Sequence, residues 1–129
     1  MTPLPTSTAM AAVVGMMLSA CALGGCQASR EPFVCPTAQA GGRDGVLPES
    51  PQAMAELGAQ LATDDQGNVL GETVVDLRRR YPEAQDAAIV DFIVTAKCPS
   101  IAADPSLSEK EKREAFDAYA QAVFDRVGG

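Results

Sequence analysis

An uncharged apolar segment near the amino terminus constrains this 129-residue chain more than any other feature. Residues 9–25 contain no charged side chain, and every Asp, Glu, Lys and Arg of the chain lies at position 30 or later. A membrane-spanning helix needs about 20 apolar residues, so this segment is short for that purpose. It fits better as the apolar region of a signal peptide that ends in small residues at a cleavage site. We therefore expect a folded domain to follow it, in a compartment that permits disulfide bonds.

Two short motifs at the end of this segment carry a family resemblance. Residues 18–21 read Leu-Ser-Ala-Cys, and residues 23–26 read Leu-Gly-Gly-Cys. Both resemble the lipobox of bacterial lipoproteins, in which an aliphatic residue and two small residues precede a cysteine. The resemblance implies that a signal peptidase cuts directly before this cysteine and that its sulfur carries a diacylglyceryl group. It also implies a lipid anchor in a bacterial membrane, facing the periplasm, with the outer membrane slightly favoured over the inner.

The number of cysteines favours Cys26 as the lipidated residue, with Cys21 as the alternative. Cleavage before Cys26 leaves Cys35 and Cys98 as a pair that can form one disulfide, whereas cleavage before Cys21 leaves an odd set of three. One feature departs from the family, because residues 1–8 lack the Lys or Arg that signal peptides usually carry. An uncleaved membrane anchor therefore stays open as a second interpretation of the amino-terminal segment.

The sequence after the lipobox predicts a tether followed by a helical domain. The stretch up to residue 49 contains three prolines and three glycines without periodic apolar residues, which is typical of a flexible linker. The predicted organisation is a signal peptide over 1–25, a lipidated amino terminus and tether over 26–49, and a helical domain over 50–129. A disulfide between Cys35 and Cys98 would fasten this tether to the domain.

Capping signals predict the first two helices of the domain. Ser-Pro at 50–51 supplies a favourable N-cap and first helical residue, and the acidic turn at 63–68 ends the helix. Inside this helix, Gly58 is expected to cost about 1 kcal/mol relative to alanine. Thr73, followed three residues later by an aspartate, resembles a capping box and predicts a short helix over 74–80.

Two longer segments are expected to form the core. Residues 83–97 are apolar over most of a helical circumference, which indicates a central helix, and Pro99 is expected to close it. Ser108 and Glu111 form a capping box that opens a last helix, which runs to about residue 127. The predicted fold is a small all-α bundle of three to four helices with one disulfide.

Composition argues against several classes of function. A net charge of −7 is unfavourable for binding nucleic acid, which requires a basic surface. Histidine is absent, which removes the commonest general base and the commonest zinc ligand. The glycine in the acidic turn 63–68 comes too early for an EF-hand calcium loop. We therefore expect no catalytic residues, no metal site and no cofactor.

Two surfaces are candidate sites for a protein partner. The last helix carries an apolar stripe, and a cluster of arginines ends the second helix. The candidate residues are Phe116, Tyr119, Val123, Phe124, Arg78, Arg79 and Arg80. Each surface also has a simpler explanation, because such a stripe often packs on a core and cations complement the carboxyl end of a helix dipole.

These observations lead to a non-enzymatic expectation for function. The first hypothesis is an envelope lipoprotein that acts as an interaction or accessory subunit, contacting another envelope protein or a membrane complex. The second is a small carrier that encloses an apolar ligand between the last two helices. A weaker third hypothesis is a periplasmic inhibitor that presents a loop constrained by its disulfide.

Overall fold

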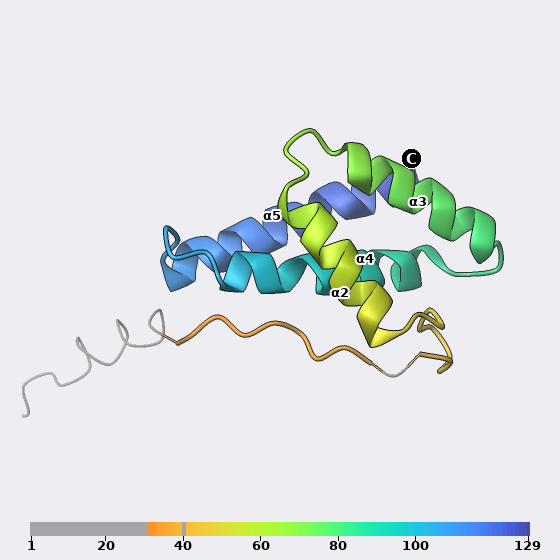
Figure 1. Ribbon diagram of the computed structural model, residues 1–129, viewed down its shortest axis with the longest axis horizontal. Helices are drawn as coiled ribbons and strands as arrows, with labels where there is room; N and C mark the ends of the chain where they lie inside the picture. Colours follow the sequence, from red (N-terminus) through yellow and green to blue (C-terminus); the bar gives the residue numbers. More distant parts are fainter. Residues whose placement is uncertain (1–30, 40) are drawn as a thin grey trace, which may run out of the picture.

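The computed structural model describes residues 31–39 and 41–129, and within these ranges the chain forms α-helices and no β-strand. The helices are α2 (Pro51–Ala62), α3 (Asn68–Arg80), α4 (Asp86–Ala102) and α5 (Glu109–Gly128) (Figure 1). The predicted all-α fold is therefore confirmed. The predicted signal peptide and both lipobox motifs lie outside the described residues.

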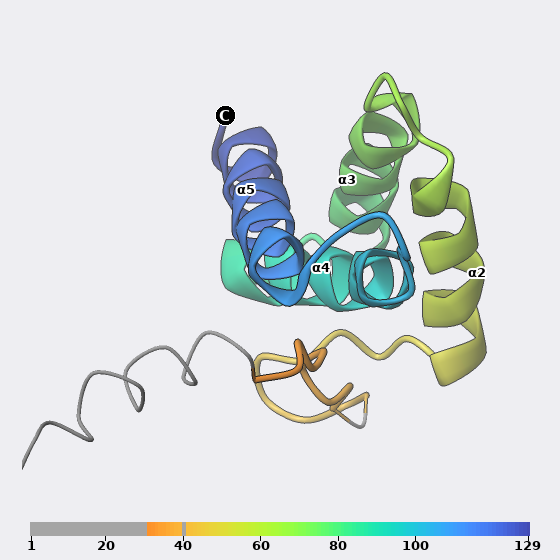
Figure 2. The ribbon, with the colours of Figure 1, turned by 90° about the vertical axis from the view of Figure 1, so that its left-hand side faces the viewer.

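Helix α4 is the centre of the fold, as its apolar circumference predicts. It buries nine residues, more than any other described helix: Ala88, Ile89, Phe92, Ile93, Val94, Thr95, Ala96, Cys98 and Ile101. Helices α2 and α5 pack on α4, and α3 lies between α2 and α5 (Figure 2). The segment 31–39 runs along the face of α4 that points away from α3.

Helix α2 begins where the sequence predicts, but its glycine has a different role. The Ser50 hydroxyl accepts a hydrogen bond from the Ala53 N–H at 3.0 Å, and Pro51 is the first helical residue. A Cβ atom on Gly58 would lie 2.3 Å from the carbonyl oxygen of Ala96 in α4. Gly58 is therefore the residue that lets the backbones of α2 and α4 approach, rather than a weak point in the helix.

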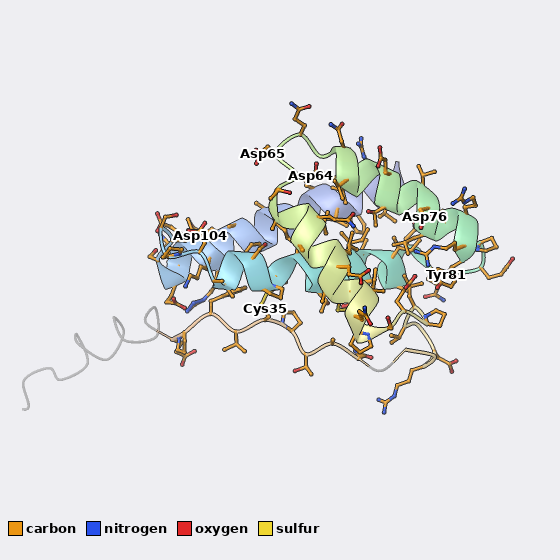
Figure 3. The ribbon with its side chains drawn as sticks, viewed as in Figure 1. Cys35, Asp64, Asp65, Asp76, Tyr81 and Asp104 are labelled. Atoms are coloured by element: carbon orange, nitrogen blue, oxygen red, sulfur yellow. A yellow bond between two sulfur atoms is a disulfide. The ribbon has the colours of Figure 1, made fainter. Side chains whose placement is uncertain are left out.

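Helix α3 begins six residues earlier than predicted, at Asn68 instead of residue 74. The chain turns at Gly67, whose φ of 72° is in the left-handed region. The Asp64 carboxylate then accepts the Leu70 N–H at 3.0 Å at the start of the helix (Figure 3). The predicted capping box at Thr73 is wrong, because the actual cap comes from the turn before the helix and leaves Thr73 in its interior.

Helix α4 also differs from the predicted range of 83–97. It begins at Asp86 and continues through Pro99 to Ala102. Pro99 was expected to end the helix because it lacks an N–H donor. The helix continues past Pro99 for three more residues, and one of them, Ile101, is buried in the protein interior. Burial of this side chain offsets the hydrogen bond that the proline removes.

The capping box of α5 and the disulfide are both confirmed. The Ser108 N–H donates to the Glu111 carboxylate at 2.7 Å, and the Ser108 hydroxyl accepts the Glu111 N–H at 3.3 Å. Cys35 and Cys98 form a disulfide that joins the segment 31–39 to helix α4. Residues 63 positions apart in the sequence are thereby held together.

Candidate functional site

The predicted apolar stripe of α5 is mostly covered by the protein itself. Val123 is completely buried, and Phe116 is half-buried, with its ring centroid 5.6 Å from that of Phe33. Phe124 is 59% exposed, because it lies on the side of α5 that faces away from the core. The stripe therefore packs on the core and on the amino-terminal segment, and of its four candidate residues only Phe124 is exposed.

Tyr119, the remaining member of the stripe, is half-buried against α4. Its hydroxyl is buried and has no hydrogen-bond partner among the described residues. The Lys97 Nζ lies 5.5 Å from the centre of its ring, an arrangement that a cation–π interaction favours. Burial, with a contribution from the nearby Asp64 carboxylate, raises the pKa of Tyr119 to about 12. The phenol therefore stays neutral at physiological pH.

The first arginine of the predicted cluster joins three parts of the fold. One Arg78 nitrogen lies 2.9 Å from the Asp86 carboxylate at the start of α4. The same nitrogen donates to the backbone carbonyl of Val127 near the end of α5. Arg78 therefore links α3, α4 and α5, and its charge is matched by the negative end of a helix and by a carboxylate.

The other two arginines are paired with acidic residues. Arg79 and Arg80 reach the two oxygens of Asp76 at 2.7 Å and 2.8 Å, and Arg80 also pairs with Glu49. Hydrogen bonds from Arg80 and Arg79 hold the pKa of the Asp76 carboxyl below its ordinary value. These cations already have anionic partners within the fold, so their charge is compensated by Asp76 and Glu49.

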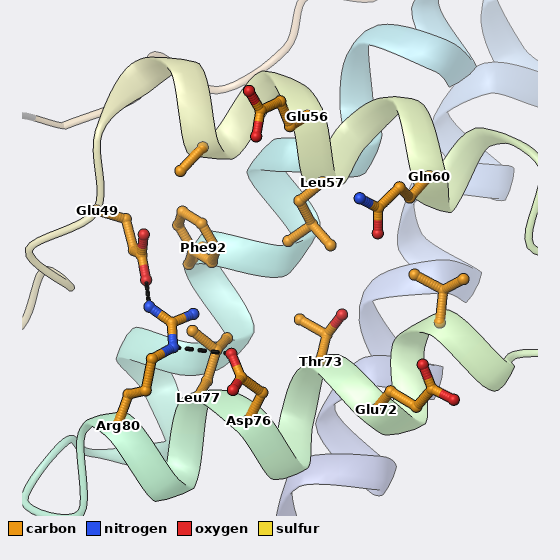
Figure 4. A pocket seen from close by; sticks show the side chains of 12 residues that line it. Glu49, Glu56, Leu57, Gln60, Glu72, Thr73, Asp76, Leu77, Arg80 and Phe92 are labelled. Carbon is orange, nitrogen blue, oxygen red and sulfur yellow. Dashed lines mark hydrogen bonds and ion pairs between the residues drawn. The ribbon is translucent and has the colours of Figure 1, made fainter.

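A groove between α2 and α3 is the strongest candidate for a binding site. Its cavity volume is about 320 Å³. Helix α4 supplies part of the lining through Phe92, and the two flanking helices supply the walls (Figure 4). The lining residues are Glu49, Ala53, Glu56, Leu57, Gln60, Val69, Glu72, Thr73, Asp76, Leu77, Arg80 and Phe92.

The lining of the groove is largely polar, with a smaller apolar part and unmatched negative charge. Glu56 projects from α2 and Glu72 from α3, on opposite sides of the groove. Neither carboxylate forms an ion pair with any residue that the structure describes. Arg80 is the single cation of the lining, and it is held by Asp76 and Glu49.

Sequence reasoning missed this groove because its walls come from two helices. Glu72 and Asp76 are four residues apart and share a face of α3, a spacing that was visible in the sequence. The opposite wall carries Glu56 and Gln60 at the same spacing. That these two faces point toward one another depends on how α2 and α3 cross α4, which no local pattern specifies.

A larger hollow lies beside the groove but is a poorer candidate. Its volume is about 620 Å³, and its lining comes from residues 44–48, from 80–85 and from Ala88. Most of these residues belong to connecting segments rather than to helices. Binding sites built on helices hold their side chains more precisely than sites built on loops. The α2–α3 groove therefore offers the better-defined surface.

The amino-terminal segment, residues 31–39, is a second feature of interest, and we call it the strap. Arg113 on α5 donates to the Glu31 carbonyl at 2.6 Å, and the Phe33 N–H donates to the Glu109 carboxylate. The Phe33 N–H and the Lys112 ammonium hold the pKa of Glu109 below its ordinary value. With the disulfide at Cys35, these contacts fasten the strap to α4 and α5 (Figure 3).

Two further findings concern the described residues as a whole. No three His, Cys, Asp or Glu side chains among them are grouped so that they could hold a metal ion. None of the described helices has both the length and the apolar character needed to cross a membrane.

Comparisons with protein-family models, with curated proteins and with solved structures found no match to this chain.

Proposed function

We propose that the chain is a bacterial envelope lipoprotein, anchored through lipidated Cys26 and acting as a non-catalytic interaction subunit in the periplasm. The observation that carries the proposal is the strap. Directly after the lipobox, the chain is fastened to α4 and α5 by the disulfide at Cys35 and by the contacts of Glu31 and Phe33. Such a connection suits a domain that is displayed at a membrane surface.

The length of free chain sets how far the domain can stand from the bilayer. Glu31 already contacts α5 through Arg113, so only the residues between Cys26 and Glu31 can act as a spacer. Four residues lie between them, and the distance from the Cα of Cys26 to the Cα of Glu31 is therefore at most about 18 Å. Each buried methylene of an acyl chain contributes about 0.8 kcal/mol, so two or more chains give a stable anchor. The domain is then held close to the membrane rather than on a long tether.

The arrangement of the strap leaves the α2–α3 groove accessible. The strap and α3 lie on opposite sides of α4, whereas α2 crosses α4 and begins beside the strap (Figure 2). No residue of the strap lines the groove. A domain anchored through the strap therefore presents its groove away from the point of attachment. This geometry supports a role in which a partner in the periplasm binds the exposed side of the domain.

The alternative role as a carrier receives less support from the packing of α5 on α4. A carrier would need space between these helices for an apolar ligand. Val123 and Val127 of α5 are instead buried in one core with Ile89 and Ile93 of α4. The side chains of the protein occupy the region where the ligand was expected.

The proposed function is tested by crosslinking in intact cells. Cells that produce the tagged chain are treated with formaldehyde, and adducts are purified from the membrane fraction. We expect a discrete adduct of the chain with an envelope protein, which disappears in the Cys26→Ser variant because the unprocessed precursor lacks the lipid anchor. Recovery of the wild-type chain without any adduct over the full range of crosslinker concentration would contradict the interaction role.

A further inference from the structure

We propose that the α2–α3 groove binds a basic amphipathic segment of the partner, in which apolar side chains enter the groove and flanking Lys or Arg side chains contact its acidic rim. This inference rests on the proposed function and deepens it, because it specifies the chemistry of the partner. It follows from three properties of the groove: its lining, its charge and its size.

The lining provides apolar surface for side chains of the partner. Leu57 and Val69 are only half-buried, so part of their surface is exposed within the groove. Leu77 and Phe92 are buried deeper and form a rigid support. Burial of apolar surface contributes roughly 25 cal/mol per Å², so covering Leu57 and Val69 favours an apolar occupant. A purely ionic ligand would not use this surface.

The charge of the rim specifies the sign of the partner. Glu56 and Glu72 flank the groove, and neither pairs with a cation of the described residues. Arg80, the one cation of the lining, is already paired with Glu49 and Asp76. A segment with Lys or Arg beside its apolar residues supplies the missing positive charge, and such complementarity confers specificity. A fatty acid anion or a nucleic acid would bring further negative charge to the same rim.

The size and the net charge exclude other occupants. A volume of about 320 Å³ is at the lower end of the range for ligand cavities, so it accommodates a few side chains while the rest of a segment lies along α2 and α3. A second copy of this chain would carry the same net charge of −7 and would be repelled at the acidic rim. A basic segment of another protein therefore fits best.

The experiment measures binding of synthetic peptides to the full chain purified in a nonionic detergent. The probe is a fluorescent peptide of about 14 residues with leucines at helical spacing and lysines elsewhere. Two matched peptides replace either the lysines by glutamate or the leucines by glutamine. Fluorescence anisotropy is recorded, and the signal from protein-free micelles is subtracted. We expect the Leu/Lys peptide to bind at least about tenfold more tightly than either matched peptide.

Matched variants locate the binding surface. The Glu56→Gln/Glu72→Gln double variant is expected to weaken binding about tenfold, since it removes the two unpaired carboxylates of the rim. Glu114→Gln/Asp117→Asn changes the net charge equally on the exposed face of α5 and is expected to leave binding unchanged. Thr73→Tyr fills the groove without changing charge and is expected to weaken binding at least tenfold. Circular dichroism verifies that each variant retains its helices.

Several results would overturn the inference. An equal loss of peptide affinity in the two double variants would indicate diffuse charge attraction. Unchanged affinity in Thr73→Tyr would show that the peptide binds outside the groove. Self-association of the chain that Thr73→Tyr abolishes would make the occupant a second copy. A cellular adduct that both groove variants retain would contradict the groove while leaving the proposed function intact. The absence of any adduct, by contrast, would contradict the proposed function itself.

Discussion

Gly58 shows how one residue can have opposite meanings in the sequence and in the structure. Helix propensity identifies it as a defect in α2, because glycine loses more backbone entropy than alanine on folding. In the fold it faces the Ala96 carbonyl at a distance that leaves no room for a Cβ atom. The close crossing of α2 and α4 cannot be inferred from the sequence, so the steric requirement for glycine at this position is visible only in the structure.

We predict that Gly58→Ala lowers the free energy of unfolding by about 1–2 kcal/mol, although alanine is the better helix former. The added methyl meets backbone, which cannot move aside, and overpacking of this kind costs more than the gain in propensity. Gly71→Ala is the control, since its Cβ would meet the end of the flexible Arg126 side chain. That variant is expected to be as stable as the wild type or up to about 1 kcal/mol more stable in urea unfolding. A Gly58→Ala protein of increased stability would refute the close approach of α2 and α4.

Asp64 provides a second prediction for a single residue, based on pH. The Leu70 N–H, which this carboxylate accepts, holds the pKa of Asp64 below its ordinary value of 3.8. A carboxyl whose pKa is lowered on folding stabilises the protein above its unfolded pKa, and this contribution is lost as the pH falls through the folded pKa. We therefore expect Asp64→Ala to lower the melting temperature at neutral pH, with the difference from wild type shrinking below pH 3.8.

The neighbouring aspartate is the control for this measurement. The Asp65 carboxylate accepts no hydrogen bond from any described residue, so Asp65→Ala is expected to change the melting temperature little at any pH. If both variants lower the melting temperature by the same amount at every pH, the cap at the start of α3 is not formed by Asp64.

At the scale of secondary structure, the sequence predicts the existence of the helices better than their ends. The starts of α2 and α5 were predictable because their caps, Ser50 and Ser108, lie within three residues of the groups that they bind. The start of α3 was missed because its cap is six residues from Leu70, across a turn at Gly67. Helix α4 continues past Pro99 to bury Ile101, a tertiary contact that local propensity does not include.

The strap and its disulfide give a prediction at the same scale. Closing a loop of 63 residues stabilises a fold by about 4 kcal/mol in the chain-entropy model. Reduction of the Cys35–Cys98 bond is therefore expected to lower the free energy of unfolding by about that amount, as measured by urea unfolding with and without dithiothreitol. The Cys35→Ser/Cys98→Ser variant should begin at the lower stability and show no response to the reductant. Native protein whose Cys35 and Cys98 are both alkylated without reduction would disprove the bond.

At the scale of the whole molecule, the sequence predicts how the chain is processed, whereas the structure shows which surfaces stay exposed after the helices pack. The all-α class, the central position of α4 and the disulfide were predictable from periodicity and from the number of cysteines. Among the candidate partner residues, Phe116 and Val123 pack internally, Arg79 and Arg80 are paired with Asp76, and Phe124 stays exposed. A surface formed by two helices becomes visible only when the packing of those helices is known.

The choice between the two lipobox cysteines gives the prediction for the whole molecule. We expect the Cys26→Ser variant to accumulate as an unprocessed precursor, because it lacks the thiol that accepts the diacylglyceryl group. Cys21→Ser is the matched control and is expected to mature normally. Immunoblotting of cell fractions distinguishes the two forms by size. The opposite pattern, with Cys21→Ser retained as precursor, would move the anchor to Cys21 and leave Cys26 as an extra thiol.

The intact mass of the protein extracted from its native membrane tests the central claim most directly. We expect a chain that begins at Cys26, retains the Cys35–Cys98 disulfide and carries the additional mass of its acyl chains. A species that retains the residues before Cys26 and has no added mass would contradict lipid anchoring, and with it the proposal that this domain works at the surface of a bacterial membrane.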